Sequence, residues 1–396
     1  MTRIFRRVLA GAGVLALTVA LTGNVSVASA PPRVAVPTLT GFASLPAGTF
    51  VPGSEPSGSQ VTGNTNGFPV PFADQPIQGF SGIVANPDGS FDVLSDNGYG
   101  NQANSADFLL RIQRLAPSFR SGTIDVLGGL TLTDPDAYVT WPLTRADRVL
   151  TGADFDVESI ARLADGSYWI GDEFGPYLLH FDRAGRLLGA PVPLPGVVAP
   201  ETAARTGATA TARSSKGFEG LAKSPDGRYL YALLEGAVTG DPAGQLRLNE
   251  FDLRTGSYTG KRYAYPLENP DLAIGDAIAI DQNRFLIIER DGGQGPTAVV
   301  KRLYVAERRG GSLTKTLLVD LMNIANPRNL GGFGPTFTFP FQTIEDVVIL
   351  DPHRIAVLND NNFPFSTGRA AGVADNNEFI TIELPASLRP DRRILT

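Results

Sequence analysis

Residues 157–173 read VESIARLADGSYWIGDE, and the order of apolar, turn and acidic residues in this stretch indicates its local structure. An apolar stretch with a carboxylate near its start leads to an Asp-Gly turn at 165–166. A second apolar stretch then ends in two more carboxylates. Two short apolar runs joined by a turn of this type are typical of a β-hairpin. The stretch therefore predicts a pair of antiparallel strands with acidic residues gathered at one edge.

The same plan occurs four more times along the chain. The first polar residues of the five segments are separated by 77, 61, 57 and 69 residues, and they are Ser81, Glu158, Glu219, Asp276 and Glu345. Each interval is long enough for about four short strands, and repeated four-stranded units form a β-propeller. We therefore expect an all-β propeller with five to seven four-stranded blades. Six blades are favoured, one of them degenerate. The alternative is a β-sandwich with coincidental hairpins.

The last unit has too little chain left for a complete blade. The segment 378–384 supplies its third strand, and few residues follow it. The segment 37–50, near the other end of the chain, has the composition of a strand and could supply the fourth. A propeller avoids exposed strand edges by closing on itself. We therefore expect closure by pairing of the N-terminal and C-terminal strands.

Composition excludes several kinds of chemistry. The 396 residues include no Cys and only 2 His, so a cysteine nucleophile, a disulfide scaffold and a thiolate or imidazole zinc site are excluded. The chain carries 40 Asp and Glu against 34 Lys and Arg, a formal charge of -6, which argues against a nucleic-acid partner. A bound metal would therefore have to be held mostly by oxygen.

The N-terminus has the layout of a secretory signal peptide. Three arginines within the first seven residues precede an apolar run at 8–21, and small residues follow. We expect a signal over residues 1–30, with cleavage near Ala28 or Ala30, and one propeller domain over residues 31–396. The mature protein would be secreted, extracellular or in the cell envelope, with no membrane span.

Pairing arithmetic places the acids opposite one another. In an antiparallel hairpin the residue numbers of any two facing residues add up to the same value, and the position and length of the turn set that value. For two-residue turns the facing pairs are Ser81 with Asp96, Glu158 with Glu173 beside Asp172, Glu219 with Leu234 beside Glu235, Asp276 with Glu289, and Glu345 with Asp360. Repetition around an axis would then bring roughly ten carboxylates to one mouth of the central channel.

Carboxylates crowded in this way repel one another and require a counter-charge. Calcium accepts six to eight oxygen ligands in flexible arrangements, so we expect Ca²⁺ at this mouth. The expected metal ligands are Asp96, Asp172, Glu173, Glu235, Asp276, Glu289, Glu345 and Asp360. The alternative is that these acids only accept backbone hydrogen bonds at strand ends. The turn acids Asp88, Asp165 and Asp226 fall at the opposite edge, and we expect them to be structural.

Three motifs carry a resemblance to a known family. They read DFDVESI at 154–160, GDEFGPY at 171–177 and KGFEGLA at 216–222. These motifs resemble the secreted bacterial family called esterase-like activity of phytase, or phytase-like domain, over about residues 40–385. The resemblance implies a propeller with recurring acids at a phosphoester site, and the family's acidic pattern falls on Glu158, Asp172, Glu173, Glu219 and Glu235.

The acids and the resemblance together predict a calcium-dependent hydrolase, with phosphoesterase activity favoured. The expected catalytic residues are Glu158, Glu219, Lys216 and Arg290. The two acids would bind the ion or activate the attacking water, and Lys216 and Arg290 would bind substrate charge. Two alternatives remain open: a calcium-dependent lactonase or carboxylesterase, which needs no basic lining, and a non-catalytic secreted propeller that binds a ligand. As an enzyme, the protein would act as a monomer on a small-molecule ester or phosphoester.

Overall fold

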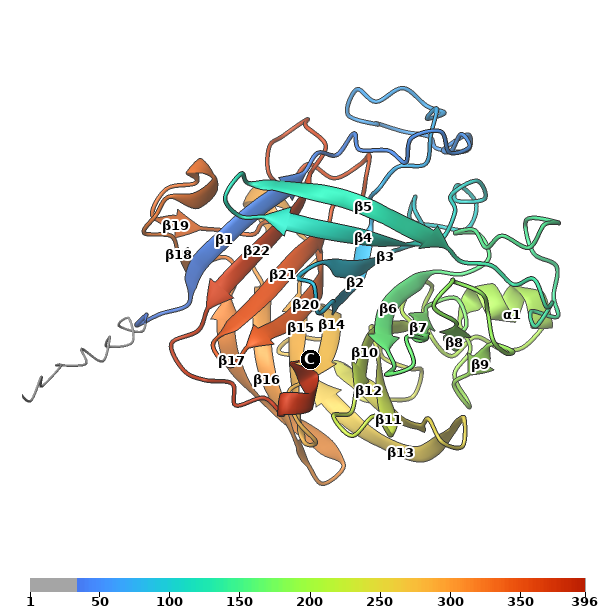
Figure 1. Cartoon of the computed structure of the whole chain (residues 1–396). Coiled ribbons are helices and arrows are strands. Elements are labelled where there is room, and N and C mark those ends of the chain that lie inside the picture. The colour runs from blue at the N-terminus through green and yellow to red at the C-terminus, as the bar shows by residue number, and fades with distance from the viewer. Residues whose placement is uncertain (1–33, 396) are drawn as a thin grey trace, which may run out of the picture. The chain divides into compact units, whose positions relative to one another are not determined.

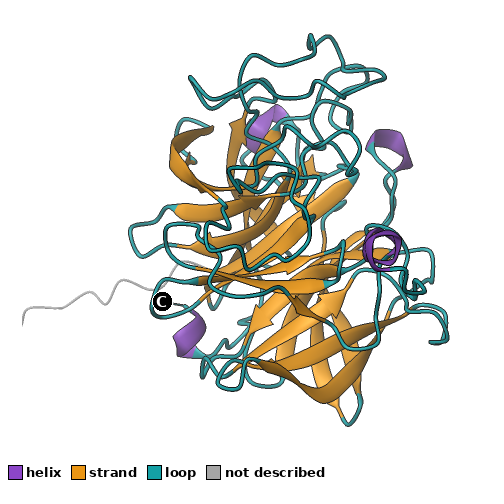
Figure 2. Ribbon diagram, turned by 90° about the vertical axis from the view of Figure 1, so that its right-hand side faces the viewer, coloured by secondary structure: helices purple, strands orange, loops and turns teal. Residues whose placement is uncertain are grey.

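The computed structural model describes residues 34–395. The expected signal peptide and its cleavage site therefore lie outside the described residues. Within 34–395 the regular structure is almost entirely β, with 22 strands, one α-helix and three short 3-10 helices (Figure 2). The helical segments are α1 (Pro200–Thr206), η1 (Gly295–Thr297), η2 (Leu330–Gly332) and η3 (Arg392–Ile394). No helix in this part of the chain is long and apolar enough to cross a membrane.

Twenty of the strands form five antiparallel units, which we call blades 1 to 5 (Figure 1). Blade 1 contains β2 (Phe80–Ala85), β3 (Phe91–Ser95), β4 (Arg111–Ser118) and β5 (Thr123–Thr131). Blade 2 contains β6 (Val157–Arg162), β7 (Tyr168–Asp172), β8 (Tyr177–Phe181) and β9 (Val192–Pro193). Blade 3 contains β10 (Phe218–Lys223), β11 (Tyr229–Leu234), β12 (Gln245–Asp252) and β13 (Ser257–Pro266). Blade 4 contains β14 (Ala273–Ala279), β15 (Arg284–Arg290), β16 (Lys301–Arg309) and β17 (Ser312–Asp320). Blade 5 contains β20 (Thr343–Asp351), β21 (Arg354–Asp360), β22 (Asn377–Glu383) and β1 (Thr38–Leu45). The short strands β18 (Ile324–Ala325) and β19 (Thr336–Phe337) pair with each other, and β18 also pairs with β1.

The first strands of the blades form a closed ring. In chain order β2, β6, β10, β14 and β20 each pack against the next, and β20 returns to β2. The fold is therefore a β-propeller, as predicted, and the β-sandwich alternative is wrong. The described residues form five blades, which is within the expected range but is not the favoured six. Dividing chain length by the repeat interval gave too many blades, because segments such as 46–79 lie between blades without adding one.

Strand exchange between the two ends of the chain closes the ring. Strand β1 pairs antiparallel with β22 along its whole length, from Thr38 opposite Glu383 to Leu45 opposite Asn377. In Figure 1 the blue β1 runs beside the red β22. The predicted closure is confirmed, and the edge of blade 5 that β1 covers is paired rather than open.

A separate apolar cluster fills each of the five interfaces between neighbouring blades. Between blades 2 and 3, for example, Trp169 and Leu178 meet Phe218 and Phe251. Each blade is therefore covered on both faces, which explains why its inner strands read as continuous apolar runs such as FLII at 285–288.

A β-bulge interrupts the inner hairpin of every blade near the repeated polar residue. In blade 2 the pairing shifts by one residue between Val157 and Ser159, so that Glu158 is the extra residue. The predicted pairing of Glu158 with Glu173 is therefore wrong: the turn is longer than two residues, which moves the register by one, and the bulge then takes Glu158 out of the ladder. A bulge redirects the side chain it carries, and bulges are frequent beside functional sites.

Close packing at the blade 4 bulge can be tested with one methyl group. Gly275 is the extra residue there, and a Cβ atom would lie 2.0 Å from the backbone oxygen of Ile344 on the next inner strand. Gly275→Ala is expected to cost roughly 3 kcal/mol of stability, seen as a lower Tm in thermal unfolding. The control is Gly311→Ala, where nothing lies within 4 Å. Equal Tm values for the two variants would contradict this packing.

Candidate functional site

Backbone pairing defines two sets of equivalent positions at one end of the ring, which we call the channel mouth. The bulge positions of blades 1 to 5 hold Ser81, Glu158, Glu219, Gly275 and Glu345. The positions that follow the second strand, or end it, hold Asp96, Glu173, Glu235, Arg290 and Asp360. Blade 4 is the exception, since it places a glycine and an arginine where most other blades place acids.

Two of the predicted metal ligands are held by backbone groups. Asp172 accepts hydrogen bonds from the N–H groups of Asp156 and Gly175, at 2.9 and 2.8 Å. Asp276 accepts one from its own neighbour at 2.7 Å and one from Val347 at 3.0 Å, which links β14 to β20. Both carboxylates therefore have structural partners, and the structure places neither among the converging acids.

Glu289 is also placed elsewhere. Its carboxylate accepts hydrogen bonds from the Tyr265 hydroxyl at 2.9 Å and the Glu268 N–H at 2.7 Å, and it forms a 2.5 Å ion pair with Lys315. The register explains this outcome: Glu289 is paired inside the ladder, and the side chain at the mouth is that of the next residue, Arg290.

Eight carboxylates gather at the mouth, and we call them the carboxylate cluster: Asp96, Asp156, Glu158, Glu173, Glu219, Glu235, Glu345 and Asp360. All of them except the partly exposed Asp96 are buried. Sequence reasoning named seven of the eight and missed Asp156. That residue could have been found from its spacing, because it lies two residues before Glu158 in an extended segment.

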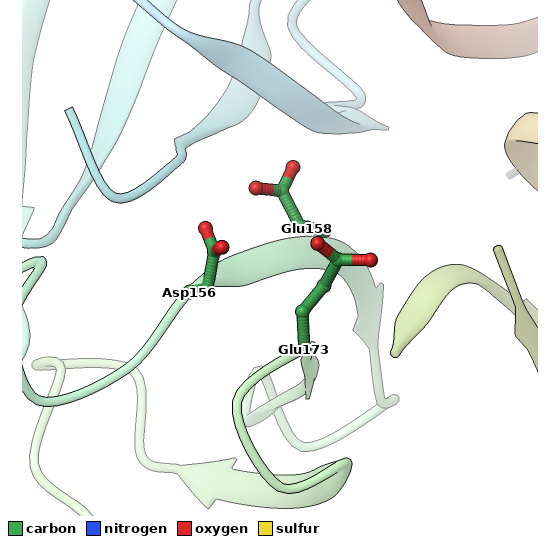
Figure 3. Close-up of side chains that lie close together, drawn as sticks. All are labelled: Asp156, Glu158 and Glu173. Atoms are coloured by element: carbon green, nitrogen blue, oxygen red, sulfur yellow. The ribbon is translucent and has the colours of Figure 1, made fainter. Parts of the chain in front are cut away.

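Three members of the cluster converge in the manner of a metal site. Asp156, Glu158 and Glu173 lie close together (Figure 3), and one oxygen of each lies within 4.8 Å of the others. Oδ1 of Asp156 and Oε1 of Glu173 are buried without a hydrogen-bond partner. Buried carboxylate oxygens without partners are costly, so the donor set fits a hard cation such as calcium. A second group of the same kind consists of Glu173, Glu219 and Glu235.

Two basic side chains enter the cluster. Nη2 of Arg290 lies 2.8 Å from Glu345, 3.1 Å from Glu235 and 3.4 Å from Glu219. Burial alone would lower the pKa of Arg290, but these carboxylates outweigh it and raise the pKa. Lys216 forms an ion pair with Glu235, and 33% of its side chain is exposed. Arg290 therefore lies within the cluster, whereas Lys216 reaches solvent at its rim.

Burial and mutual repulsion change the protonation of these acids. Burial, followed by the charges of neighbouring acids, raises the pKa of Glu158, Glu173 and Glu219 well above the usual range. Burial and the charge of Glu345 raise the pKa of Asp360 to about 8. In the absence of a cation, part of the cluster therefore holds protons at neutral pH.

The turn acids behave as the sequence predicted. Asp88, Asp165 and Asp226 each accept hydrogen bonds from serine and backbone groups of their own turns. Their structural role is confirmed. These three acids are not members of the carboxylate cluster.

Fold and site together define a five-bladed propeller with a buried carboxylate cluster at one channel mouth. The chain belongs to the Phytase-like family, described as esterase-like activity of phytase, whose model matches residues 75–363. This description fits a hydrolase.

Other similarities are more distant. An uncharacterized secreted protein of the fungus Arthroderma benhamiae is 27% identical over an alignment that covers 42% of this chain and 46% of the fungal chain. A PQQ-bound aldose sugar dehydrogenase from Streptomyces coelicolor is 12% identical, covering 89% of this chain and 100% of that chain with a TM-score of 0.40. A luciferin-regenerating enzyme is 11% identical, covering 80% and 82% with a TM-score of 0.37. Neither structural likeness is close enough to bear on fold or activity.

Proposed function

We propose that the protein is a secreted, calcium-dependent hydrolase of phosphomonoesters or phosphodiesters, with its active site at the channel mouth. The observation that carries this proposal is the convergence of Asp156, Glu158 and Glu173 with two buried, unpartnered oxygens. The family description supports ester hydrolysis, and the fungal relative, named as a secreted protein, supports export.

Different residues of the chain have different roles at this site. Asp156, Glu158 and Glu173 would hold the ion, which when bound supplies a Lewis acid for the phosphoryl group and for water. Lys216, at the exposed rim, binds phosphoryl oxygens and orients the substrate. Glu219, which lies outside this group but next to Glu173, is the carboxylate that we assign to proton removal from the attacking water.

A second candidate function is hydrolysis of a carboxylic ester or lactone. Arg290, one of the two basic side chains in contact with the cluster, is already paired with three carboxylates. This leaves little positive charge for a highly charged phosphate ester and favours a neutral ester. The non-catalytic alternative is a propeller in which calcium stiffens a ligand-binding mouth.

One assay series separates these functions. Purified protein is tested against aryl phosphate, bis-aryl phosphate and aryl acetate, with calcium and with a chelator. We expect chelator-sensitive turnover of one or both phosphates. Turnover of the acetate alone would favour the second candidate, and no turnover of any substrate would favour the binding protein.

A further inference from the structure

Blade 4 has a positively charged residue at the position where the other four blades have an acid. The equivalent residues of blades 1, 2, 3 and 5 are Asp96, Glu173, Glu235 and Asp360, whereas blade 4 has Arg290. Its side chain is only 9% exposed, and it extends into the carboxylate cluster. The ring of acids is therefore broken at one fixed place by a guanidinium group.

A single nitrogen of this guanidinium makes the contacts with the acids. Nη2 touches carboxylate oxygens of Glu219 and Glu235 from blade 3 and of Glu345 from blade 5. Strands β10 and β20, which carry Glu219 and Glu345, are not neighbours in the ring, so Arg290 bridges across blade 4. Three oxygens converging on one point is also the arrangement that a small cation requires.

The two possible metal groups are not equally available. Glu173 belongs to both, but the remaining members of the second group are Glu219 and Glu235, which Arg290 already contacts. A calcium ion at those oxygens would need distances of about 2.3–2.6 Å. Nη2 lies 3.4 Å from Oε1 of Glu219 and 3.1 Å from Oε1 of Glu235, so an ion in the second group would lie beside the guanidinium and be repelled by its charge.

We propose that the channel mouth binds one divalent cation, at Asp156, Glu158 and Glu173, and that the guanidinium of Arg290 permanently occupies a second cation position. This inference rests on the proposed calcium site and adds the number of ions and the residue that limits it. The first group is free to accept the ion, because Oδ1 of Asp156 and Oε1 of Glu173 lack partners. A chelator would remove the ion but not the fixed charge of Arg290.

The test is the stoichiometry of calcium binding, measured by calorimetric titration of chelator-treated protein with calcium chloride. The wild type is expected to bind one ion, and Arg290→Gln is expected to bind two, because the second group then loses the buried guanidinium and keeps only the solvent-reaching Lys216 beside it. Arg290→Lys keeps the charge and should still bind one ion. Arg369→Gln is the matched control, since Arg369 also pairs with a buried acid, Glu378, outside the cluster.

The outcomes separate this inference from the proposed function. Two ions in the wild type, or one ion in Arg290→Gln, would overturn the role of Arg290 while leaving the calcium site in place. No binding in either protein would overturn both. Folding is followed by near-UV circular dichroism, and an Arg290→Gln variant that folds only with calcium would support the inference. A variant that stays unfolded even in calcium would overturn it.

Discussion

Replacing Glu173 by glutamine is expected to lower calcium affinity by at least ~100-fold, because even residues that only support metal ligands cost 10–100-fold. Glu173 is shared by both possible metal groups, and its Oε1 has no other partner. The amide keeps the size of the side chain but removes its charge. Calorimetric titration measures the affinity, and hydrolysis of the aryl phosphate substrates measures the activity.

Calcium concentration distinguishes a ligand role from a structural one. If Glu173 acts through the ion, activity of Glu173→Gln should return as calcium is raised toward the new Kd. The matched control is Glu307→Gln, where the glutamate forms a surface ion pair with Arg309. The ligand role is wrong if both variants bind calcium as tightly as the wild type.

Removing calcium is expected to destabilise the protein, and more so at high pH. Burial raises the pKa of the cluster acids, so the folded protein holds protons that the unfolded chain has released. Without an ion, this contribution to stability is present below about pH 4, the ordinary pKa of these acids, and is lost as the pH rises through the raised values. For Asp360 the raised value is about 8.

Calcium should reverse this loss, because an ion replaces the protons. At a free calcium concentration 1,000 times the Kd, the stabilisation is about 4 kcal/mol, enough to raise Tm by several degrees. Thermal unfolding with calcium and with chelator, from pH 5 to 8.5, measures the effect. We expect the Tm difference to grow with pH, and a constant or shrinking difference would contradict the account.

The repeated hairpins, the closing strand and most of the acids could be predicted because they depend on local patterns. A single segment of the sequence is enough to recognise the apolar runs, the Asp-Gly turn and the position of Glu158 within its repeat. Pairing of β1 with β22 followed from the missing fourth strand of the last unit. The number of blades could not be fixed, because long insertions made the repeat interval uneven.

The exact composition of the cluster depended on the bulges, which leave no clear signal in the sequence. The bulge of blade 4 falls at Gly275, one residue before Asp276, and this places Arg290 instead of Glu289 at the mouth. It also left Asp276 bound to the backbone of the next inner strand. Arg290 was predicted to bind substrate charge, but its pairing with three acids depends on contacts between blades that no single repeat contains.

Asp156, Glu158 and Glu173 are the residues that we propose to hold a calcium ion. The most direct measurement is anomalous diffraction from crystals soaked in calcium chloride, using wavelengths at which calcium scatters anomalously. We expect one peak within about 2.6 Å of an oxygen of each residue. The absence of a peak at that position, in crystals that show calcium elsewhere, would contradict it.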